Sequence, residues 1–395
     1  MDSFEFLIAG GGILGISIGI EILKKEPRAR VLIVEKESLA GAHASGRNSG
    51  VLHAGFYYSA DSLKARFCAD GNLALREVIK RKNIPINECG KVVVANSESE
   101  LGELEKLHSR GLQNGVEQEI FSANQLQNYE PFAKTHKYFL WSPNTAVSDP
   151  VLLLSALEEE FRKLGGEIRF NSHLDVRDGD CFVNNVKIGA SRVINAAGTG
   201  AISIAHSLGL GKKYSQLPVL GLYKITKSKL MPLKRLIYPV PNPEYPFLGV
   251  HFTLTVNGDI KIGPTAIPVL GSEQYRWHEG VSQSQLYETF RSISSLLKKD
   301  AVLLFNLAKE ELPKISTRVL LKDAEKLVPG IAKVKDWENK RPGIRAQLID
   351  TESGKFQMDF VVENEGKFIH VLNAVSPGWT ASIPFAKYIV DQYVS

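Results

Sequence analysis

Apolar residues at the start of the chain fall into short runs that predict alternating strands and a helix. Residues 4–9 form a run consistent with a buried parallel strand, and residues 13–24 have the length and composition of a helix that Pro27 helps to end. Residues 30–34 then predict a second buried strand, which ends at Glu35. A strand, a glycine turn, a helix and a strand fit into about thirty residues, which is the size of one βαβ unit.

The pattern changes character near residue 214. Before it, we expect helices over residues 61–82, 97–114 and 149–164, and strands over residues 91–95, 167–170, 174–177, 181–187 and 192–195. After it, residues 221–226, 249–255 and 259–263 alternate and predict an antiparallel sheet in a separate domain. Helices are expected again over residues 283–299, 316–327 and 381–393, with a strand over residues 368–372.

Composition limits the class of protein. The 395 residues are 44% hydrophobic, which suggests two domains with large cores. A net charge of +5 without a basic recognition segment argues against nucleic acid as a partner. Cys68, Cys89 and Cys181 are far apart, so we expect free thiols, with no disulfide framework and no metal site. The apolar residues 6–23 are interrupted by five glycines, and we therefore expect a soluble, cytoplasmic protein.

The turn between the first strand and the first helix has the spacing G-x-G-x-x-G at Gly10, Gly12 and Gly15. Gly10 permits the tight turn, Gly12 lets the backbone approach a pyrophosphate, and Gly15 lets the helix pack closely on the strand. The helix N-terminus presents N–H groups to the phosphates. Glu35 is placed to accept hydrogen bonds from the adenosine ribose and would repel a 2′-phosphate, which argues against NADP.

The glycine motif does not say which dinucleotide binds. Two further features favour FAD through similarity to flavoproteins of the glutathione-reductase and D-amino-acid-oxidase types. One is the polar loop at residues 41–55, which directly follows Glu35. The other is the strand at residues 193–195 that runs into Ala196-Ala197-Gly198.

Four segments carry a more specific resemblance: SGRNSGVLHAGFYY at residues 45–58, IYPVPNPEYPFLGVHFT at 237–253, PGIRAQ at 342–347 and NAVSPG at 373–378. Together the chain resembles the L-2-hydroxyglutarate dehydrogenases and oxidases of the D-amino-acid-oxidase superfamily. The resemblance extends from residue 5 to about residue 390, although Trp379 stands where a small residue is expected.

The resemblance implies an α/β protein with two domains. We expect a Rossmann-like FAD-binding domain of residues 1–85, 146–213 and 340–395. Residues 86–145 and 214–339 would form an α+β substrate-binding domain with an antiparallel sheet. The implied reaction is oxidation of L-2-hydroxyglutarate to 2-oxoglutarate by hydride transfer from C2 to flavin N5, with a quinone or oxygen as electron acceptor.

Other functions stay open at this point. The alternatives within the superfamily are a glycerol-3-phosphate dehydrogenase and an amine oxidase for glycine or sarcosine. A different class is a non-catalytic flavin-binding protein or a partner in tRNA modification. The oligomeric state and any covalent attachment of FAD are not determined by the sequence.

The implied chemistry assigns roles to individual residues. His53, in the loop expected beneath the flavin, is the first candidate for the base, and His251 is the second. Arg345 is expected to bind a substrate carboxylate, for which its forked guanidinium is suited. The alternative role of each histidine is a structural one, and the alternative role of Arg345 is an interdomain salt bridge. Tyr57, Tyr238 and Gln347 are candidate substrate contacts.

The cofactor contacts expected from the motifs and the resemblance lie in or next to the glycine turn, the end of the second strand, the Ala196-Ala197-Gly198 turn and three of the four segments. Before the last helix, Gly378 is placed so that the helix dipole can stabilise charge on reduced flavin N1. The expected set is Gly10, Gly12, Gly15, Glu35, Lys36, Ser45, Arg47, Asn48, Ser49, Ala197, Gly198, Gly343, Ser376, Gly378, Trp379 and Thr380.

One basic segment has no assigned role in the reaction. Residues 211–236 hold Lys212, Lys213, Lys224, Lys227, Lys229, Lys234 and Arg235 and no acidic residue. A solvated surface explains such a run. The alternative is contact with anionic lipid at the inner face of a membrane, from which electrons would pass to a quinone.

Overall fold

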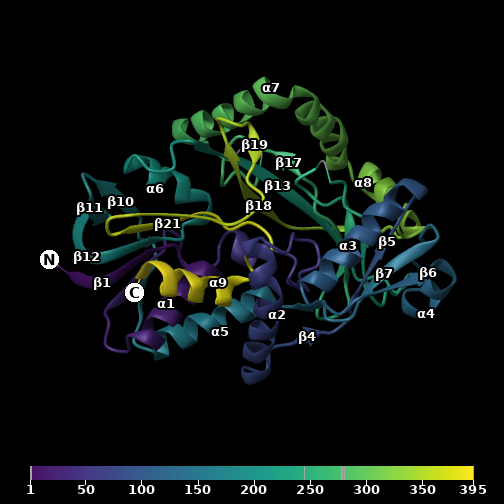
Figure 1. The fold of residues 1–395 in the computed structure, drawn as a ribbon, viewed down its shortest axis with the longest axis horizontal. Coiled ribbons are helices and arrows are strands. Elements are labelled where there is room, and N and C mark those ends of the chain that lie inside the picture. Colours follow the sequence, from purple (N-terminus) through teal and green to yellow (C-terminus); the bar gives the residue numbers. More distant parts are fainter. Residues whose placement is uncertain (1, 244, 277–278, 280, 395) are drawn as a thin grey trace.

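The computed structural model describes residues 2–243, 245–276, 279 and 281–394, so Glu244 of the segment at 237–253 lies outside the described residues. The chain forms two sheet-based parts that lie side by side (Figure 1). The part at the left of Figure 1 contains both ends of the chain, and β13 and β18 run from the middle into the part at the right.

The first part is built on a sheet with a parallel centre. In the described chain its strands are β1 (Ser3–Ala9), β2 (Val31–Val34), β9 (Glu167–Arg169), β10 (Leu174–Arg177), β11 (Asp180–Val183), β12 (Val186–Asn195), β20 (Val361–Glu365) and β21 (Phe368–Asn373). The order β9-β2-β1-β12-β21 is parallel throughout. β2, β21 and the second half of β1 are buried throughout, as strands covered on both faces must be.

Helices cover this sheet and form its core. α1 (Ile13–Lys25) packs against α5 (Pro150–Lys163) and α9 (Ser382–Ile389), and Gly19 of α1 leaves room for the ring of Phe161. α6 (Ala201–Ser207) follows β12. The predicted βαβ unit at the start of the chain is confirmed by the parallel pairing of β1 with β2.

The second part contains the mostly antiparallel sheet that the alternating segments predict. Its strands in the described residues are β5 (Lys91–Val94), β6 (Glu119–Ser122), β7 (Tyr138–Ser142), β13 (Tyr214–Thr226), β14 (Leu236–Pro239), β15 (His251–Leu254), β16 (Ile260–Gly263), β17 (Ile267–Pro268), β18 (Glu338–Asp350) and β19 (Lys355–Phe356). Among the described strands of this sheet, only β14 and β5 pair in parallel. β18 pairs with β13 along its length, so residues 340–350 belong to this sheet. The exact domain limits stay a prediction.

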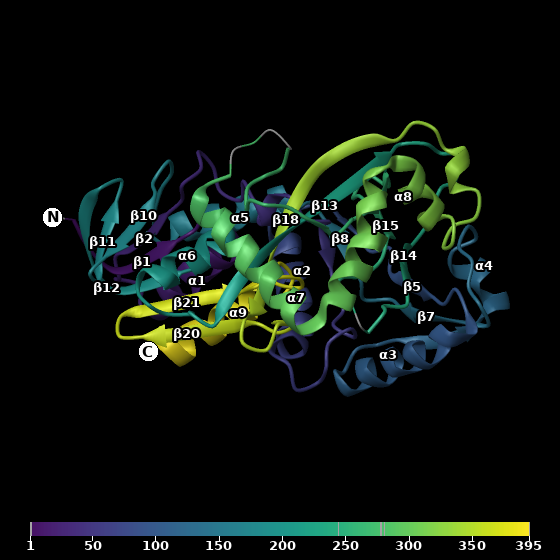
Figure 2. The same ribbon diagram turned by 90° about the horizontal axis from the view of Figure 1, so that it is seen from above.

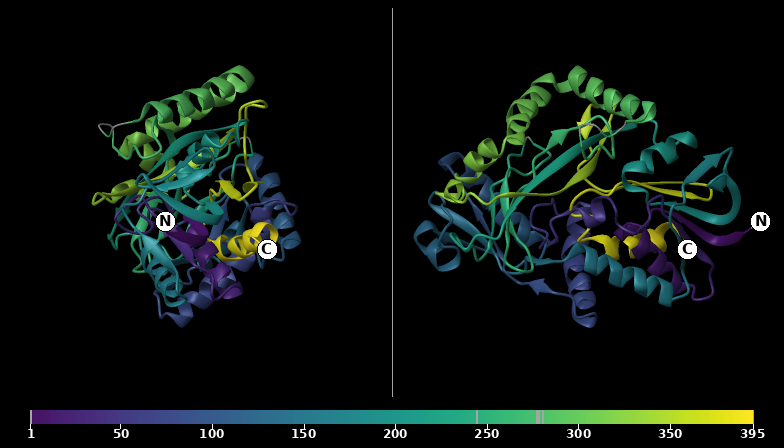
Figure 3. Two further views of the ribbon diagram at one scale, coloured as in Figure 1. Left: turned by 90° about the vertical axis from the view of Figure 1, so that its left-hand side faces the viewer. Right: turned by 180° about the vertical axis from the view of Figure 1, so that it is seen from behind.

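Helices also cover the second sheet. α7 (Gln283–Glu311) and α8 (Thr317–Ala324) lie along its outer side, while α3 (Leu101–Gln113) and α4 (Leu126–Tyr129) lie towards the end with β6 and β7 (Figure 2). α7 bends at Asp300, which has non-helical angles (φ −151°, ψ 71°). The predicted end at residue 299 therefore marks this bend, and the helix continues to Glu311. Seen from the end of the molecule, α7 forms one edge (Figure 3).

A small sheet lies between the two parts. It joins β3 (Val51–Leu52), β8 (Ala146–Ser148) and β4 (Ile86–Asn87) in antiparallel pairs. α2 (Leu63–Arg81) follows β3, in agreement with the helix predicted over residues 61–82. This arrangement fixes the segment that carries His53 at the boundary between the two larger sheets.

One predicted strand is wrong. Residues 181–187 were expected to form a single strand, but they belong to two antiparallel strands, β11 and β12, joined at Asn184 and Asn185. Both asparagines have positive φ (49° and 66°), as a two-residue type I′ hairpin turn requires. Among the described helices, none is long and apolar enough to cross a membrane.

Candidate active site

One large cavity brings the predicted site residues together. It has a volume of about 1080 Å³ and extends from the glycine turn after β1 to residues of the second sheet. Every predicted site residue except Gly15 lines it. A cavity of this size is at the upper end of the range for ligand pockets, which leaves room for a large cofactor beside a small acid.

The glycine turn has the close contacts that the motif predicts. Gly10 has a positive φ of 106°, and a Cβ there would lie 2.6 Å from the carbonyl oxygen of Ala196. A Cβ on Gly15 would lie 2.0 Å from the carbonyl oxygen of Gly10, so Gly15 serves the packing of α1 on β1. The N-cap of α1, Gly12, has no side-chain cap, and the N–H of Ile13 donates to Ser45 Oγ at 3.0 Å. This end of α1 suits a phosphate.

Glu35 closes β2 beside this turn. Its Oε2 accepts a hydrogen bond from the N–H of Gly11 at 2.7 Å, and its Oε1 accepts one from the N–H of Glu37 at 2.9 Å. The carboxylate is thus held directly next to the glycine turn, where a ribose would lie if a dinucleotide phosphate occupied the end of α1.

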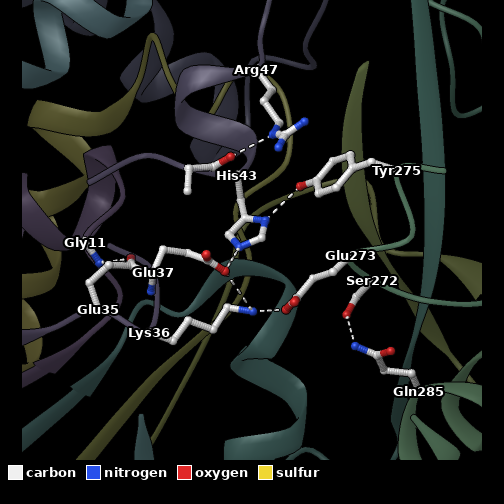
Figure 4. A network of polar contacts seen from close by, with 11 residues as sticks. Gly11, Glu35, Lys36, Glu37, His43, Arg47, Ser272, Glu273, Tyr275 and Gln285 are labelled. Atoms are coloured by element: carbon white, nitrogen blue, oxygen red, sulfur yellow. Dashed lines mark hydrogen bonds and ion pairs between the residues drawn. The ribbon is translucent and has the colours of Figure 1, made fainter. Parts of the chain in front are cut away.

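A polar network covers the same end of the cavity (Figure 4). The His43 ring lies between Glu37, 2.9 Å from Nε2, and the hydroxyl of Tyr275, 2.8 Å from Nδ1. The Arg47 guanidinium lies 3.7 Å from the centre of the Tyr275 ring, and Lys36 forms an ion pair with Glu273. The segment with Glu273 and Tyr275 therefore crosses the cavity and contacts the loop after β2.

Two of the predicted cofactor contacts in this region already have partners within the chain. Arg47 donates from Nε to the carbonyl of Ala42 at 2.7 Å and from Nη1 to that of Pro342 at 3.2 Å. The Asn48 amide donates to the carbonyl of Ser45 at 2.7 Å and accepts from the N–H of Gly50 at 2.8 Å. Both side chains hold the shape of the loop, and their contact with a cofactor stays a prediction.

Glu37, His43 and Glu273 also form a group that could hold a metal ion, since their ligand atoms lie within 4.8 Å of one another. The ammonium of Lys36 contacts both carboxylates, at 3.8 Å from Glu37 and in an ion pair with Glu273. A cation is therefore supplied by the chain itself, and we assign no metal there.

The backbone of His53 is fixed from two sides. Its N–H donates to Thr380 Oγ1 at 3.2 Å, and the same hydroxyl donates to the carbonyl of Val51 at 3.2 Å. From α2, the Asn72 amide donates to the carbonyl of His53 at 3.1 Å. Burial, followed by the charges of Lys91 and His251, holds the pKa of His53 well below its usual value. The imidazole is thus neutral at physiological pH.

His251 begins β15 in the second sheet. Its Nδ1 lies 2.8 Å from the carbonyl oxygen of Gly249, and its ring centre lies 4.0 Å from that of Tyr238. A carbonyl oxygen can only accept a hydrogen bond, so Nδ1 carries the hydrogen of the neutral ring and Nε2 has a free lone pair. Burial lowers the pKa of His251 to about 3. Both histidines are therefore in the form that a proton acceptor needs.

Arg345 and Gln347 lie two residues apart on β18, and both line the cavity. The Arg345 guanidinium lies 5.7 Å from the Phe247 ring centre and forms no ion pair with an acidic residue in the described chain. The alternative role of an interdomain salt bridge therefore has no support. Gln347 donates to the carbonyl of Gln357 at 3.0 Å, which fixes its amide.

Four buried polar atoms in the cavity wall have no hydrogen-bond partner among the described residues: Nδ1 of His53, the hydroxyl of Tyr57, Nε2 of Gln216 and Nε1 of Trp379. Unpartnered buried polar atoms are rare in folded proteins. In the same lining, an added Cβ on Gly198 would meet nothing within 4 Å. The wall thus offers space and free polar groups, which fits a bound cofactor.

Several residues in or next to the cavity carry no signal in the sequence. Tyr275 was not singled out, because nothing near it in the sequence marks a segment that crosses the cavity. Tyr223, on β13, lines the cavity and hydrogen-bonds Arg345. Lys261 donates to the carbonyl of Ser49 at 2.6 Å, and burial lowers its pKa to about 8. Tyr223 and Lys261 come near the loop at 45–50 only through the pairing of β13, β16 and β18.

Similarity to known proteins agrees with this geometry. The family model described as "FAD dependent oxidoreductase" matches residues 5–392. The chain is 33% identical to the L-2-hydroxyglutarate dehydrogenase of Salmonella houtenae, over 98% of this chain and 93% of that protein. It is 34% identical to that of Indibacter alkaliphilus over 96% of both chains, and 32% identical to the mitochondrial enzyme of Caenorhabditis elegans over 100% and 94%.

Solved structures agree on the fold. L-alpha-glycerophosphate oxidase from Mycoplasma pneumoniae, described with FAD bound, has a TM-score of 0.76 at 23% identity and covers 99% of this chain and 94% of its own. Glycine oxidase from Geobacillus kaustophilus has a TM-score of 0.71 at 20% identity, covering 100% and 95%. With the cofactor cavity, the matched family model and these relatives, the chain belongs to the family of FAD-dependent oxidoreductases.

Proposed function

We propose that the protein oxidises L-2-hydroxyglutarate to 2-oxoglutarate with FAD as its cofactor. The full-length similarity to L-2-hydroxyglutarate dehydrogenases carries this proposal. The cavity supports it, because it combines two neutral histidines with an arginine that has no acidic partner in the described chain. The similar glycerophosphate and glycine oxidases are below 25% identity, so they support the fold and not a substrate.

FAD, when bound, supplies the acceptor for the hydride that leaves C2 of the substrate. The chain supplies the remaining groups. His53 takes the proton of the C2 hydroxyl, so that the oxygen can form the carbonyl of the product. His251, with its lone pair on Nε2, is the second candidate for this role. Arg345 binds a substrate carboxylate with two parallel hydrogen bonds, and Tyr57 and Tyr238 bound the space around it.

The C-terminal turn has a role in the same site. A Cβ on Gly378 would lie 2.1 Å from the carbonyl oxygen of Ala374, so only glycine fits this turn. The turn leads into α9, whose N-cap, Ala381, has no side-chain cap. This end is the positive end of the helix dipole, which is suited to stabilise negative charge on the reduced cofactor.

Anaerobic reduction of the purified yellow protein tests the reaction. L-2-Hydroxyglutarate should bleach the flavin, whereas glycerol 3-phosphate, glycine and sarcosine should not. His53→Asn should keep its FAD but reduce it at least about 100-fold more slowly, as expected for loss of a general base. His136→Asn, which changes a surface histidine paired with Glu98, is the control.

Each other outcome has a meaning. Bleaching only by glycerol 3-phosphate or by an amine selects the corresponding alternative enzyme. A flavin that no hydroxy or amino acid reduces favours a non-catalytic flavoprotein. An undiminished rate in His53→Asn removes His53 as the base, and His251→Asn then tests the second candidate.

The electron acceptor in this proposal is a membrane quinone, reached by peripheral contact of α7 with the membrane. Large apolar side chains are exposed along α7, with 65% of Tyr287, 59% of Phe290 and 69% of Phe305 exposed. Lys298 and Lys299 are exposed on the same helix. An apolar helix face with nearby lysines is typical of helices that lie on anionic membranes.

The basic run at residues 211–236 contributes less to such a surface than the sequence suggests. Thirteen of its residues form β13, and at about 3.3 Å per residue Lys224 is about 33 Å from the start of the strand at Tyr214. Only its start lies beside α7, where Arg291 donates to the carbonyl of Tyr214 at 3.1 Å. The proposed surface therefore consists of α7 with Lys212 and Lys213.

Co-sedimentation with vesicles tests this surface. The protein should bind phosphatidylglycerol vesicles more strongly than phosphatidylcholine vesicles, and salt should weaken the binding. The double change Phe290→Ser and Phe305→Ser should lower the partition coefficient at least about tenfold, since each buried apolar side chain contributes roughly 1.5–3 kcal/mol. Leu73→Ser, an exposed leucine of α2, is the matched control. Equal sedimentation of the double variant and the wild type contradicts the proposal.

A further inference from the structure

Lys91 is a buried lysine whose ammonium has no hydrogen-bond partner. Lys91 lies on β5 and is 0% exposed. Among the described residues, its Nζ has no hydrogen-bond acceptor and forms no ion pair. Lysine is rarely buried without a partner, because removing a charge from water is costly. The residue therefore needs a reason to be there that stability alone does not provide.

Aromatic rings surround this ammonium instead of acceptors. Lys91 Nζ lies 4.1 Å from the ring centre of Tyr238, 5.1 Å from that of Tyr57 and 5.3 Å from that of Phe56. All three distances fall within the range of cation–π attraction. Tyr238 is held there because β14 pairs with β5, with Tyr238 opposite Val93. Phe56 and Tyr57 come from the loop that also carries His53.

This cage adjoins the two candidate bases. It shares the Tyr238 ring with His251, and its Phe56 and Tyr57 lie on the same loop as His53. The Tyr238 ring that contacts Lys91 also lies 4.0 Å from the His251 ring, measured between ring centres. The charge of Lys91 lowers the pKa of both His53 and His251. Lys91 is thus close enough to both imidazoles to act on them without touching the cavity, whose lining does not include it.

The other ionisable groups around the pair are few. Arg345 and Lys261 are positive and also lower the pKa of His251. Next to Lys91, burial raises the pKa of the Cys68 thiol to about 12 and that of the Cys89 thiol to about 11, and it raises those of Tyr57 and Tyr238 as well. These groups are therefore neutral at physiological pH. Among the groups that act on the two imidazoles, all charges are positive.

We propose that Lys91 is a positioning residue that keeps His53 and His251 neutral, so that they can accept the substrate proton below neutral pH. The inference rests on the proposed role of these histidines as bases. Burial lowers the pKa of Lys91 to about 7. Lys91 is therefore charged in the acidic range, where its charge adds to the effect of burial in keeping the imidazoles neutral. Above that range it loses its charge, and the imidazoles need no help to stay neutral.

The sign of the pH effect follows from this charge. A positive neighbour disfavours the imidazolium, so removing it raises the pKa of the histidine. The loss of activity on acidification should then begin at a higher pH in a variant without the charge. Lys91→Met keeps most of the side-chain volume and removes the charge, whereas Lys91→Arg keeps a positive group.

The first experiment measures anaerobic flavin reduction by L-2-hydroxyglutarate from pH 5 to pH 9. Lys91→Met should match the wild type within about twofold at pH 8.5. The midpoint of its acidic limb should lie about one pH unit higher, which corresponds to a rise of about one unit in the pKa of the base and to a rate up to about tenfold lower on that limb. Lys91→Arg should keep the acidic limb of its pH profile at the position that it has in the wild type. An equal slowing at all pH values, or an unmoved acidic limb, would overturn the proposal.

A second measurement does not depend on the substrate. Exchange of the imidazole C2 hydrogen, followed by mass spectrometry at several pH values, reports the pKa of His53 and of His251 directly. Both should rise in Lys91→Met holoenzyme. If L-2-hydroxyglutarate fails to reduce the flavin but these pKa values rise, the proposed substrate is wrong and the effect of Lys91 stands. If the flavin is reduced and the values do not move, the role of Lys91 is wrong.

Thermal unfolding separates this role from a purely structural one. Removal of a buried charge without a polar partner should leave the melting temperature of Lys91→Met unchanged or higher. A lower melting temperature together with an unmoved acidic limb would assign Lys91 to packing of the aromatic cage, and would contradict the proposal.

Discussion

A neutral imidazole can accept a proton only at the ring nitrogen that carries no hydrogen. In His251 the carbonyl of Gly249 fixes the hydrogen on Nδ1 and leaves Nε2 free. In His53 the backbone is fixed by Thr380 and Asn72, while Nδ1 has no partner in the described chain. At the scale of single residues, contacts to the backbone thus position the two histidines and leave a nitrogen of each ring without a partner in the described chain.

Arg345 allows a test at the scale of one residue. Lysine would keep the charge but lose the two parallel hydrogen bonds to a carboxylate. Because a hydrogen bond to a charged group contributes roughly 1.5–3 kcal/mol, Arg345→Lys should raise the KM for L-2-hydroxyglutarate at least about tenfold, with a smaller change in kcat. Steady-state kinetics with the purified enzyme measure both constants.

The matched control is Arg341→Lys, an exposed position on the same strand. It should leave both constants unchanged. An unchanged KM in Arg345→Lys would show that Arg345 does not bind the substrate carboxylate in a bidentate manner.

At the scale of elements, the position of α1 depends on the absence of side chains. Gly15 brings the first turn of α1 against the turn that ends β1, and the helix end that suits a phosphate depends on this contact. The bend of α7 at Asp300 and the hairpin at Asn184 and Asn185 are comparable cases, because in each of them a single backbone conformation sets the direction of a whole element.

Gly15→Ala should therefore damage both stability and cofactor binding. Its Cβ would lie 2.0 Å from the carbonyl oxygen of Gly10, and overpacking of this kind costs typically 1–3 kcal/mol. We expect a lower melting temperature and a lower FAD content per chain, measured by thermal unfolding and by absorbance.

Gly102→Ala in α3 is the matched control, since a Cβ there meets nothing within 4 Å. It should stabilise the protein by about 0.5–1 kcal/mol, because alanine favours a helix interior over glycine. If Gly15→Ala behaved like Gly102→Ala, the close approach of α1 to the glycine turn would have no role in FAD binding.

At the scale of the whole molecule, the cavity exists because two sheets meet. The first sheet supplies the glycine turn and the strand end at Asn195, while the second supplies β13, β15 and β18. The segment with Glu273 and Tyr275 adds a connection across the cofactor end, through contacts with Lys36, His43 and Arg47 (Figure 4). This segment thus links the two parts of the chain at the cofactor end of the cavity.

Loss of this connection should release the cofactor more readily. Tyr275→Ala removes a hydrogen bond to His43 and a ring contact with Arg47, which together contribute on the order of 1–2 kcal/mol. We expect FAD to dissociate about tenfold faster, measured by the recovery of flavin fluorescence after dilution. Tyr287→Ala on the exposed face of α7 is the control, and an equal dissociation rate in the two variants would contradict the prediction.

The sequence alone determined the features that depend on neighbouring residues. The βαβ unit with its glycine turn follows from local periodicity and from three glycines at fixed spacing, and the structure confirms it. The resemblance of the four segments to a family indicated the fold class and FAD, which the matched family model confirms. The helix predicted over residues 149–164, which is α5 (Pro150–Lys163), follows from Asp149 and Pro150, because capping is a local interaction.

Only the tertiary structure decided what lies next to what across the cavity. Tyr275, Tyr223 and Lys261 have no local signal, since their positions depend on strand pairing and on a segment that crosses between the two parts. Lys91 looks like an ordinary lysine at the start of a strand until pairing with β14 places it among three aromatic rings. Burial and electrostatic effects act through space, so side chains far apart in the sequence acquire their chemistry only when the sheets meet.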